Sequence, residues 1–329
     1  MHYLVVGGAG YIGSHAVDLL VNQGHKVTVL DNLVTGHQKA IHPEAEFVQG
    51  DVRDRQILDQ IFADDDFDGV FHFAAFSLVG ESVDQPLKYF DNNVQGMIQL
   101  LESMQEHQVK KIVFSSTAAV YGNVDQEFIQ EDAVKLPTSP YGESKLMMEK
   151  IIDWCDQAYG IRYVSLRYFN VAGAKPNGEI GEDHHPETHL IPIILQVAQG
   201  KRDQLEVFGD DYPTPDGTCI RDYIHVSDLV EAHALAMDYL NKDLESQIIN
   251  LGSNNGYSVL QMLEAARRVT NHSIPARITD RRPGDPARLV ASSQKAREVL
   301  GWVPHITDVH EMIQSAWEWF NKYPEGYED

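Results

Sequence analysis

Two side chains of this sequence, Tyr141 and Lys145, have the types and spacing to move a proton together. Residues four positions apart share one face of an α-helix, so the phenol and the ammonium would lie side by side. A neighbouring positive charge favours the ionised phenol and lowers the pKa of tyrosine from its reference value near ~10. The pair predicts a general base for a substrate hydroxyl, although an ordinary surface Tyr and Lys is the simpler interpretation of the pair alone.

A hydroxyl-rich segment, SSTAAVYG at residues 115–122, follows an apolar run that is typical of a strand. The carboxyl ends of parallel strands form the ligand crevice of α/β sheets. Thr117 could therefore hold the reacting oxygen of a substrate. A hydroxyl that caps the end of the strand is the alternative.

A glycine-rich turn, GGAGYIG at residues 7–13, lies between an expected strand and an expected helix. Gly7 and Gly10 would let the backbone approach a pyrophosphate, which the N–H groups of the helix would bind. Asp31 ends the second expected strand, where a carboxylate binds a ribose 2′-hydroxyl and repels a 2′-phosphate, so NAD is favoured over NADP. Asp51 follows the third strand and could bind adenine, or could equally cap a loop.

Strands alternate with helices through the first half of the chain, which predicts a parallel sheet with right-handed crossovers. We expect strands at 2–6, 26–30, 47–50, 69–73, 111–115 and 163–167, and helices at 12–22, 56–62, 91–107, 141–159, 189–199, 227–240, 258–270, 292–300 and 307–323. Residues 171–187 are expected to form a long loop. The predicted fold is a Rossmann-type doubly wound sheet with a smaller α/β substrate-binding domain. We expect the boundary at residues 171/172, with segments near 219–252 returning to the first domain.

Composition excludes several classes of protein. The 329 residues carry 26 Lys and Arg against 49 Asp and Glu, a formal charge of −23, which argues against nucleic-acid or anionic-membrane partners. No apolar run approaches the ~18 residues that a membrane-spanning helix needs. Cys155 and Cys219 cannot build a disulfide framework, and no secretory leader is recognisable, so we expect a cytoplasmic protein.

The three motifs together resemble the extended short-chain dehydrogenase/reductase family, and within it the sugar-nucleotide 4-epimerases. Further segments carry the resemblance over nearly the whole chain: GES at 80–82, DNNV at 91–94, RYFN at 167–170, GTCIRDYIHV at 217–226, NLG at 250–252 and RRPGD at 281–285. Related dehydratases and decarboxylases place acidic residues just after the hydroxyl residue. Ala118 and Ala119 stand there in this chain and cannot transfer protons, so hydride removal and return without elimination is expected.

The resemblance implies reversible epimerisation at C4 of a UDP-hexose through a 4-keto intermediate, with tightly bound NAD, in galactose metabolism. Tyr141 would take the proton of the 4-hydroxyl, Thr117 would hold the 4-oxygen, and Lys145 would bind the nicotinamide ribose. The cofactor contacts would be Gly7, Gly10, Tyr11, Ile12, Gly13, Asp31, Asn32, Asp51, Val52, Phe73, Ala74, Ala75, Ser77, Asn92, Tyr141, Lys145 and Phe169. The UDP-sugar contacts would be Thr117, Tyr141, Asn170, His189, Leu190, Val207, Phe208, Arg221, Tyr223, Arg282, Asp285 and Leu289.

Three positions depart from the family pattern or vary within it. Ser77 replaces a lysine of some relatives, and His189 stands where others have asparagine. Leu289 matches a gate that is a bulky tyrosine in strict enzymes and smaller in enzymes that accept N-acetyl sugars. Leucine is intermediate, so we expect UDP-glucose and UDP-galactose as substrates and leave N-acetylhexosamines open. A UDP-pentose 4-epimerase and a non-catalytic nucleotide-sugar sensor are the alternatives.

Two further expectations concern metals and partners. His184, His185 and His189 are read as loop histidines with no metal, because no tetrahedral set follows from their spacing. The helices at 91–107 and 141–159 carry more apolar residues than one buried face requires. Two such helices per chain could form a four-helix interface in a homodimer, or could pack only on the sheet.

Overall fold

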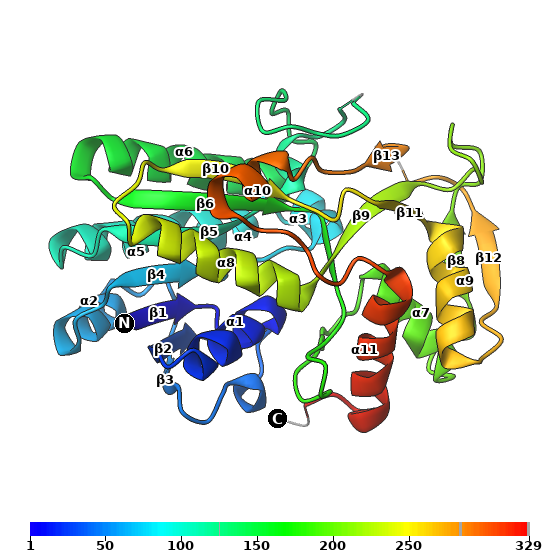
Figure 1. Cartoon of the computed structure of the whole chain (residues 1–329), viewed down its shortest axis with the longest axis horizontal. Helices are drawn as coiled ribbons and strands as arrows, with labels where there is room; N and C mark the ends of the chain where they lie inside the picture. The colour runs from blue at the N-terminus through cyan, green and yellow to red at the C-terminus, as the bar shows by residue number, and fades with distance from the viewer. Residues whose placement is uncertain (125, 283–284, 328–329) are drawn as a thin grey trace.

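The computed structural model describes residues 1–124, 126–282 and 285–327. Its main sheet has seven strands, all parallel, in the order β10-β6-β5-β4-β1-β2-β3 (Figure 1). The strands are β1 (His2–Val6), β2 (Lys26–Asp31), β3 (Glu46–Gln49), β4 (Gly69–His72), β5 (Lys111–Thr117), β6 (Arg162–Tyr168) and β10 (Gln247–Leu251). The order of the strands reverses between β1 and β4, and a crevice opens at such a switch point beyond the carboxyl ends of the strands.

Helices cover both faces of this sheet (Figure 1). One face is covered by α1 (Tyr11–Asn22), α8 (Val226–Leu240) and α10 (Gln294–Leu300), and the other by α2 (Arg55–Asp64), α5 (Gly96–Glu106) and α6 (Pro140–Tyr159). The local sequence explains the bounds of α6: the Ser139 side chain accepts from the N–H of Gly142, proline occupies the first turn, and Gly160 ends the helix at φ +68°.

The second half of the chain builds a separate core beside the sheet. This core lies among α7 (Leu190–Ala198), α9 (Val259–Thr270) and α11 (Val309–Lys322). A four-stranded sheet contains β7 (Asn170–Ala172), β9 (Ile220–His225), β11 (Gly256–Ser258) and β13 (Arg288–Leu289), and a two-stranded sheet pairs β8 (Leu205–Phe208) with β12 (Ala276–Thr279). The second half also sends α8 and β10 back to the main sheet, and the division at residues 171/172 stays a prediction.

The predicted α/β fold class is confirmed, while several local predictions need correction. Residues 91–107 were expected as one helix, but a π-helix (Phe90–Gln95) precedes α5, and two short helices, α3 (Val79–Asp84) and α4 (Pro86–Tyr89), lie before it. β7 overlaps the start of the loop expected at 171–187, and the strands after residue 200 were not predicted. These strands have two to six residues, too few for periodicity to separate them from loops.

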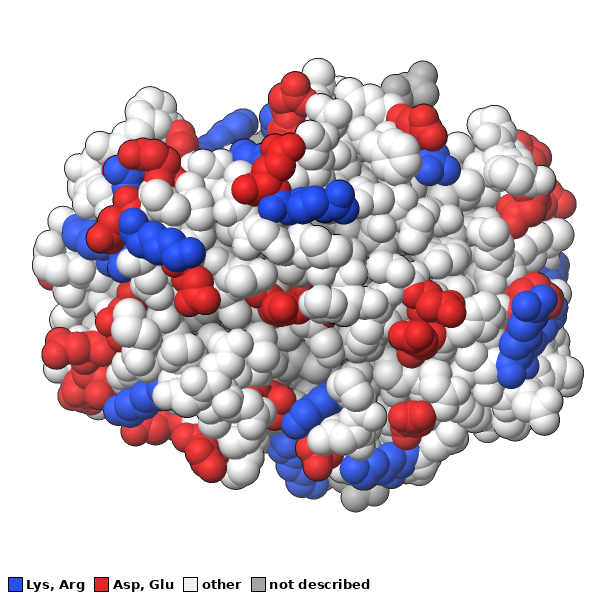
Figure 2. Space-filling model, in the orientation of Figure 1, with Lys and Arg blue, Asp and Glu red and all other residues white. Residues whose placement is uncertain are grey.

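The excess of acidic residues lies on the surface. On the face drawn in Figure 2, Asp and Glu side chains are spread over both halves of the molecule and interspersed with Lys and Arg. Such a distribution favours solubility and does not form a cationic track for a polyanion. Within the described residues, the helices are too short or too polar to cross a membrane.

Candidate active site

A cavity of about 1610 Å³ lies beyond the carboxyl ends of the parallel strands, between the main sheet and the second half of the chain. Residues from both halves line it, including the glycine turn, the hydroxyl-rich segment after β5 and strand β9. A cavity of this size can hold two nucleotide-sized ligands, since ligand pockets commonly measure about 300–1,000 Å³ each.

The glycine turn forms one wall of the cavity, and two of its glycines have no room for a side chain. A Cβ on Gly7, which has φ +82°, would lie 2.5 Å from the Ala74 nitrogen, and one on Gly13 would lie 2.0 Å from the Gly7 oxygen. Gly10 is the N-cap of α1 and has no side chain that could accept a hydrogen bond. The N–H groups in the first turn of α1 are therefore not covered by a capping side chain. This cradle fits the pyrophosphate of a dinucleotide, as the sequence predicted.

Asp31 lies at the end of β2, next to the glycine turn. Its carboxylate accepts hydrogen bonds from the N–H of Ala9 at 3.0 Å and of Leu33 at 2.9 Å. Burial raises the pKa of Asp31, and these two N–H groups oppose the shift. Because both oxygens keep a lone pair, the carboxylate can still accept from the hydroxyls of a ribose.

Asp51 is not among the residues that line the cavity, and its contact with the cofactor stays a prediction. Its carboxylate accepts from the Asn32 amide at 3.1 Å and from the Arg53 guanidinium at 2.8 Å. The hydrogen bond from Arg53 holds the pKa of Asp51 well below its usual range. Asn32 and Val52 line the cavity, and the hydrogen bond from Asn32 to Asp51 orients the Asn32 side chain.

Thr117, Tyr141 and Lys145 meet at the centre of the cavity wall, where β5 ends and α6 begins. The Lys145 ammonium donates to the Ser115 carbonyl oxygen at 2.8 Å and lies 4.9 Å from the centre of the Phe114 ring. The Thr117 hydroxyl accepts from the N–H of Ala119 at 3.2 Å, which is the strand-end cap of the alternative interpretation. Capping uses one lone pair and leaves the hydroxyl proton able to donate.

The predicted pKa of Tyr141 is wrong in sign for the protein by itself. Burial raises the pKa of Tyr141, and the Thr117 hydroxyl opposes that shift only in part. Burial also lowers the pKa of Lys145 to about 7, against the opposing charge of Glu149. Desolvation therefore dominates at both groups, and at the phenol it is the hydrogen bond with Thr117, not the charge of Lys145, that opposes it.

A buried ion pair behind Thr117 was missed by the sequence analysis. Arg167 donates to both carboxylate oxygens of Glu149, at 2.9 and 2.6 Å, and both side chains are less than 5% exposed. The Ser116 hydroxyl also donates to Glu149, so the network fixes the end of β5 against α6. The two residues are 18 positions apart, and only the folded chain shows that they pair.

Arg221 and Arg282 lie on the opposite wall of the cavity, in the second half of the chain. The Arg221 side chain donates to the Pro286 carbonyl oxygen at 2.9 Å and forms a 3.5 Å ion pair with Asp285. The Arg282 guanidinium lies 3.9 Å from the centre of the Phe208 ring. Two cations beside an aromatic ring suit a diphosphate attached to a base. Pro283 and Gly284 of the same motif lie outside the described residues.

Val207 is the other predicted contact residue that does not line the cavity. It is 1% exposed and packs in the core of the second half, away from the cavity. The next residue of β8, Phe208, lines the cavity. The structure brings the remaining predicted residues to the cavity: Gly7, Gly10, Tyr11, Ile12, Gly13, Asp31, Asn32, Val52, Phe73, Ala74, Ala75, Ser77, Asn92, Thr117, Tyr141, Lys145, Phe169, Asn170, His189, Leu190, Phe208, Arg221, Tyr223, Arg282, Asp285 and Leu289.

Asp222 supports the substrate wall and was also missed as a functional residue. It is 1% exposed and accepts from the N–H and the hydroxyl of Ser253 and from the N–H of Ala291. Burial raises the pKa of Asp222 to about 6 against these hydrogen bonds. The carboxylate thereby joins three segments around β9, the strand that carries Arg221.

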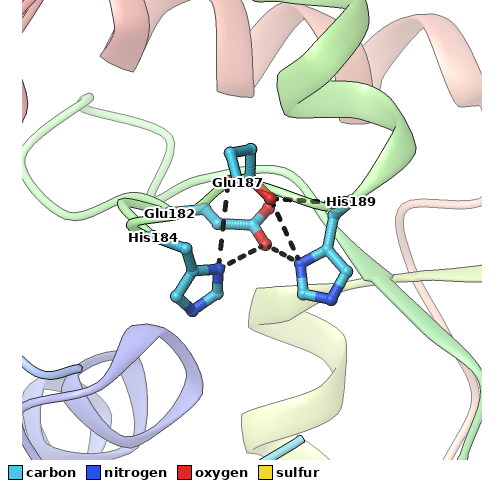
Figure 3. A group of neighbouring side chains, drawn as sticks. All are labelled: Glu182, His184, Glu187 and His189. Atoms are coloured by element: carbon cyan, nitrogen blue, oxygen red, sulfur yellow. Dashed lines mark hydrogen bonds and ion pairs between the residues drawn. The ribbon is translucent and has the colours of Figure 1, made fainter. Parts of the chain in front are cut away.

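The loop before α7 places four side chains together that the sequence analysis did not connect. The imidazoles of His184 and His189 flank the carboxylates of Glu182 and Glu187 in the cavity wall (Figure 3). Burial alone would lower the pKa of His189, but the Glu182 carboxylate raises it to about 9. Burial would raise the pKa of Glu182, but His189 and His184 lower it to about 2.

Comparisons with known proteins give one consistent result. Residues 3–252 match the model of the NAD dependent epimerase/dehydratase family. The chain is 60% identical over 331 aligned positions to the UDP-glucose 4-epimerase of Streptococcus mutans, covering 100% of this chain and 99% of that protein.

Solved structures agree with the sequence comparisons. A crystal structure of a UDP-glucose 4-epimerase matches with a TM-score of 0.98 at 56% identity and 100% coverage of both chains. The UDP-glucose 4-epimerase of Bifidobacterium longum in complex with NAD+ and UDP matches with a TM-score of 0.94 at 39% identity, covering 99% of this chain and 100% of that chain.

Proposed function

Because the chain belongs to the NAD dependent epimerase/dehydratase family, we propose that it is an NAD-dependent UDP-glucose 4-epimerase that interconverts UDP-glucose and UDP-galactose in galactose metabolism. The observation that carries the proposal is the shared cavity of about 1610 Å³. Its walls bring a dinucleotide cradle, the phenol of Tyr141 and two arginines together. The family membership confirms the resemblance found in the sequence motifs.

The chain's own side chains divide the work of the reaction. When bound, NAD supplies the hydride acceptor and donor, and the positive charge of its oxidised ring favours the ionised phenol. Tyr141 takes the proton of the sugar 4-hydroxyl as the 4-keto sugar forms and returns that proton at the end. Thr117 donates a hydrogen bond to the same oxygen. Arg221 and Arg282 hold the diphosphate while the sugar turns to present its other face.

The residues next to Thr117 limit the chemistry to epimerisation. Ala118 and Ala119 form a short 3-10 helix (Ala118–Val120) directly after β5. Methyl side chains carry no acid or base, so a 4-keto sugar at this site loses neither water nor carbon dioxide through them. A non-catalytic sensor is disfavoured because binding alone needs no phenol placed beside a hydroxyl and an ammonium.

One experiment tests the proposed activity and its alternatives together. The purified protein is denatured, the released NAD is measured, and the native protein is assayed with UDP-glucose, UDP-xylose and UDP-N-acetylglucosamine. We expect close to one NAD per chain and turnover of UDP-glucose. Turnover of UDP-xylose alone would favour the UDP-pentose 4-epimerase, and bound NAD without any turnover would favour the sensor.

Leu289 is proposed to set the size of the sugar pocket. It lies in β13, where it is in register with Arg221 of β9, and it lines the cavity. We expect Leu289→Tyr to lower kcat/KM for UDP-N-acetylglucosamine about tenfold relative to UDP-glucose, since a bulkier side chain fills the space of the acetyl group. Leu244→Tyr, an exposed position outside the cavity, is the control. An unchanged ratio in Leu289→Tyr would contradict the assignment.

We further propose that the enzyme is a homodimer of the cytoplasm. Met97 of α5 and Met148 of α6 are buried by the chain itself, whereas Met147 and Trp154 of α6 are 36% and 68% exposed. An exposed apolar stripe on α6 supports an interface between two copies. The free thiols of Cys155 and Cys219 suit a reducing compartment. Light scattering of wild type and Trp154→Glu measures the oligomeric state.

A further inference from the structure

We propose that Glu182, His184, Glu187 and His189 form a zinc site that fixes the loop at residues 182–189 in the wall of the cavity. This inference goes beyond the proposed function, because the hydride and proton steps need no metal. It also departs from the sequence analysis, which expected loop histidines without a metal. That expectation considered the histidines alone and left out the two carboxylates that complete the set.

The geometry of the four side chains carries the proposal. One ligand atom of each lies within 4.8 Å of every other. The His184 Nδ1 atom is 3.3 Å from Glu182 Oε1 and 3.9 Å from Glu187 Oε2, and His189 Nδ1 is 3.7 Å from Glu187 Oε1. Zinc bonds of about 2.0–2.2 Å in a tetrahedron place neighbouring ligand atoms about 3.3–3.6 Å apart. The His189 Nδ1 atom also lies 2.5 Å from Glu182 Oε1, so these two atoms must separate by about 1 Å to receive the ion, whereas the other three separations need only small movements.

The ligand atoms converge on one point. Both imidazoles direct Nδ1 toward the carboxylates, so the four side chains surround the space between the rings (Figure 3). The Glu187 Oε1 atom accepts from the N–H groups of Thr188 and His189 at 2.7 and 2.8 Å. These two hydrogen bonds orient the Glu187 carboxylate, as supporting contacts orient the ligands of metal sites.

Burial and charge favour an ion at this point. Glu182 and Glu187 are 5% and 8% exposed, and two carboxylates so close together repel each other unless a positive charge lies between them. Neutral imidazoles would leave the cluster at −2, the charge that a divalent cation neutralises. The site is closed by four protein ligands, which is typical of structural zinc.

The chemistry of the ligands selects the metal. Two imidazole nitrogens and two carboxylate oxygens suit zinc, whereas calcium and magnesium prefer sites built wholly from oxygen. All four ligands lie within eight residues, in the pattern Glu-x-His-x-x-Glu-x-His. One short loop can therefore wrap the ion without help from distant segments.

The position of the cluster indicates what the ion would do. The His184 ring lies 6.4 Å from the ring of Tyr11, the first residue of α1 at the dinucleotide cradle. His189 caps α7, and the next residue, Leu190, lines the same cavity. A metal that joins residues 182 to 189 would hold the two ligand subsites at a fixed separation.

Zinc content measured on the whole protein tests the proposal independently of turnover. The protein is prepared without chelator, exchanged into metal-free buffer and analysed for zinc by atomic emission, as wild type, Glu182→Gln/His184→Gln and His185→Gln. His185 is the matched control, because its side chain is 80% exposed and pairs with Asp183 outside the cluster. We expect about one zinc per chain in wild type and His185→Gln. We expect zinc affinity to fall more than about tenfold in the double variant.

A second measurement covers the case in which the double variant folds poorly. Cobalt(II) titrated into chelator-treated wild type is expected to give the intense visible absorption of a tetrahedral site, and one equivalent of zinc should remove it. Equal zinc content in all three proteins, or no tetrahedral cobalt spectrum in wild type, would overturn the proposal. The cluster would then be an ion-pair network of protonated histidines and carboxylates.

Discussion

The two walls of the cavity recognise their ligands by different means. The wall beside β1 and β2 uses backbone: glycines that admit no Cβ and the first turn of α1. The wall beside β9 uses charged side chains, Arg221 and Arg282, held by Asp285 and the Phe208 ring. Recognition of a ligand by backbone groups depends on a few consecutive residues. Recognition by charged side chains depends on segments that are far apart in the sequence.

The histidines of the two regions differ in the same way. Burial within the main sheet lowers the pKa of His72 to about 3, with a further contribution from Lys145. Near the substrate wall, the Glu182 carboxylate outweighs burial and raises the pKa of His189 to about 9. These two histidines respond differently because only His189 has carboxylates beside its imidazole.

The largest expected effect comes from a substitution in the glycine turn, which forms the cavity wall beside β1 and β2. Gly7→Ala combines a positive φ, which costs about 1–2 kcal/mol, with overpacking against Ala74, which costs about 1–3 kcal/mol. We expect a loss of about 2–5 kcal/mol of unfolding free energy and most of the bound NAD, measured by urea denaturation and by NAD release. Gly24→Ala has the same φ of +82° but no atom within 4 Å of the new Cβ, so it isolates the cost of the backbone. Equal losses in both variants would contradict a sterically built cradle.

The next largest effect is expected from a substitution of Arg221, in the cavity wall beside β9. Arg221→Gln removes a charge-assisted contact worth about 1.5–3 kcal/mol, so we expect UDP to bind about 10–150-fold more weakly while the NAD content stays at the wild-type level. Calorimetric titration with UDP measures the affinity, and Arg277→Gln, exposed on β12, is the control. A loss of NAD in Arg221→Gln would mean that the two walls do not act separately.

The smallest effect concerns the neutral histidine of the main sheet. The folded pKa of His72 is about 3, below the value of 6.5 for the unfolded chain, so the unfolded state binds more protons between these values. Its contribution to stability is complete above pH 6.5 and is lost as the pH falls toward 3. We expect His72→Leu to reduce the loss of unfolding free energy between pH 7.5 and 5.5 by on the order of 1 kcal/mol.

The control for that measurement is a histidine on the surface. We use His305→Gln, whose side chain is 72% exposed, as the surface control. A His72→Leu protein with the full wild-type slope would show that other groups carry the acid sensitivity.

The difference between the walls also explains how far the sequence could predict the structure. The glycine turn and Asp31 were predicted because each depends on a strand, a turn and a helix that follow one another along the chain. Val207 and Phe208 are consecutive residues of β8, a strand that the sequence did not predict, and of the two only Phe208 lines the cavity.

Other features depend on burial and on distant neighbours. The rise in the pKa of Tyr141 follows from desolvation, which no pattern of residue types reveals. The Arg167–Glu149 pair and the hydrogen bonds of Asp222 join segments that only the folded chain brings together. The cluster at 182–189 is local in sequence, but the burial of its carboxylates follows only from the folded chain.

Steady-state kinetics of Tyr141→Phe test the central claim, that ligand binding is divided between the two walls while Tyr141 moves the proton. The variant keeps the ring and loses only the hydroxyl. We predict wild-type NAD content and UDP affinity, with kcat for UDP-galactose lower by about 10²–10⁴-fold. Turnover within a few-fold of wild type, with NAD and UDP still bound, would contradict the account.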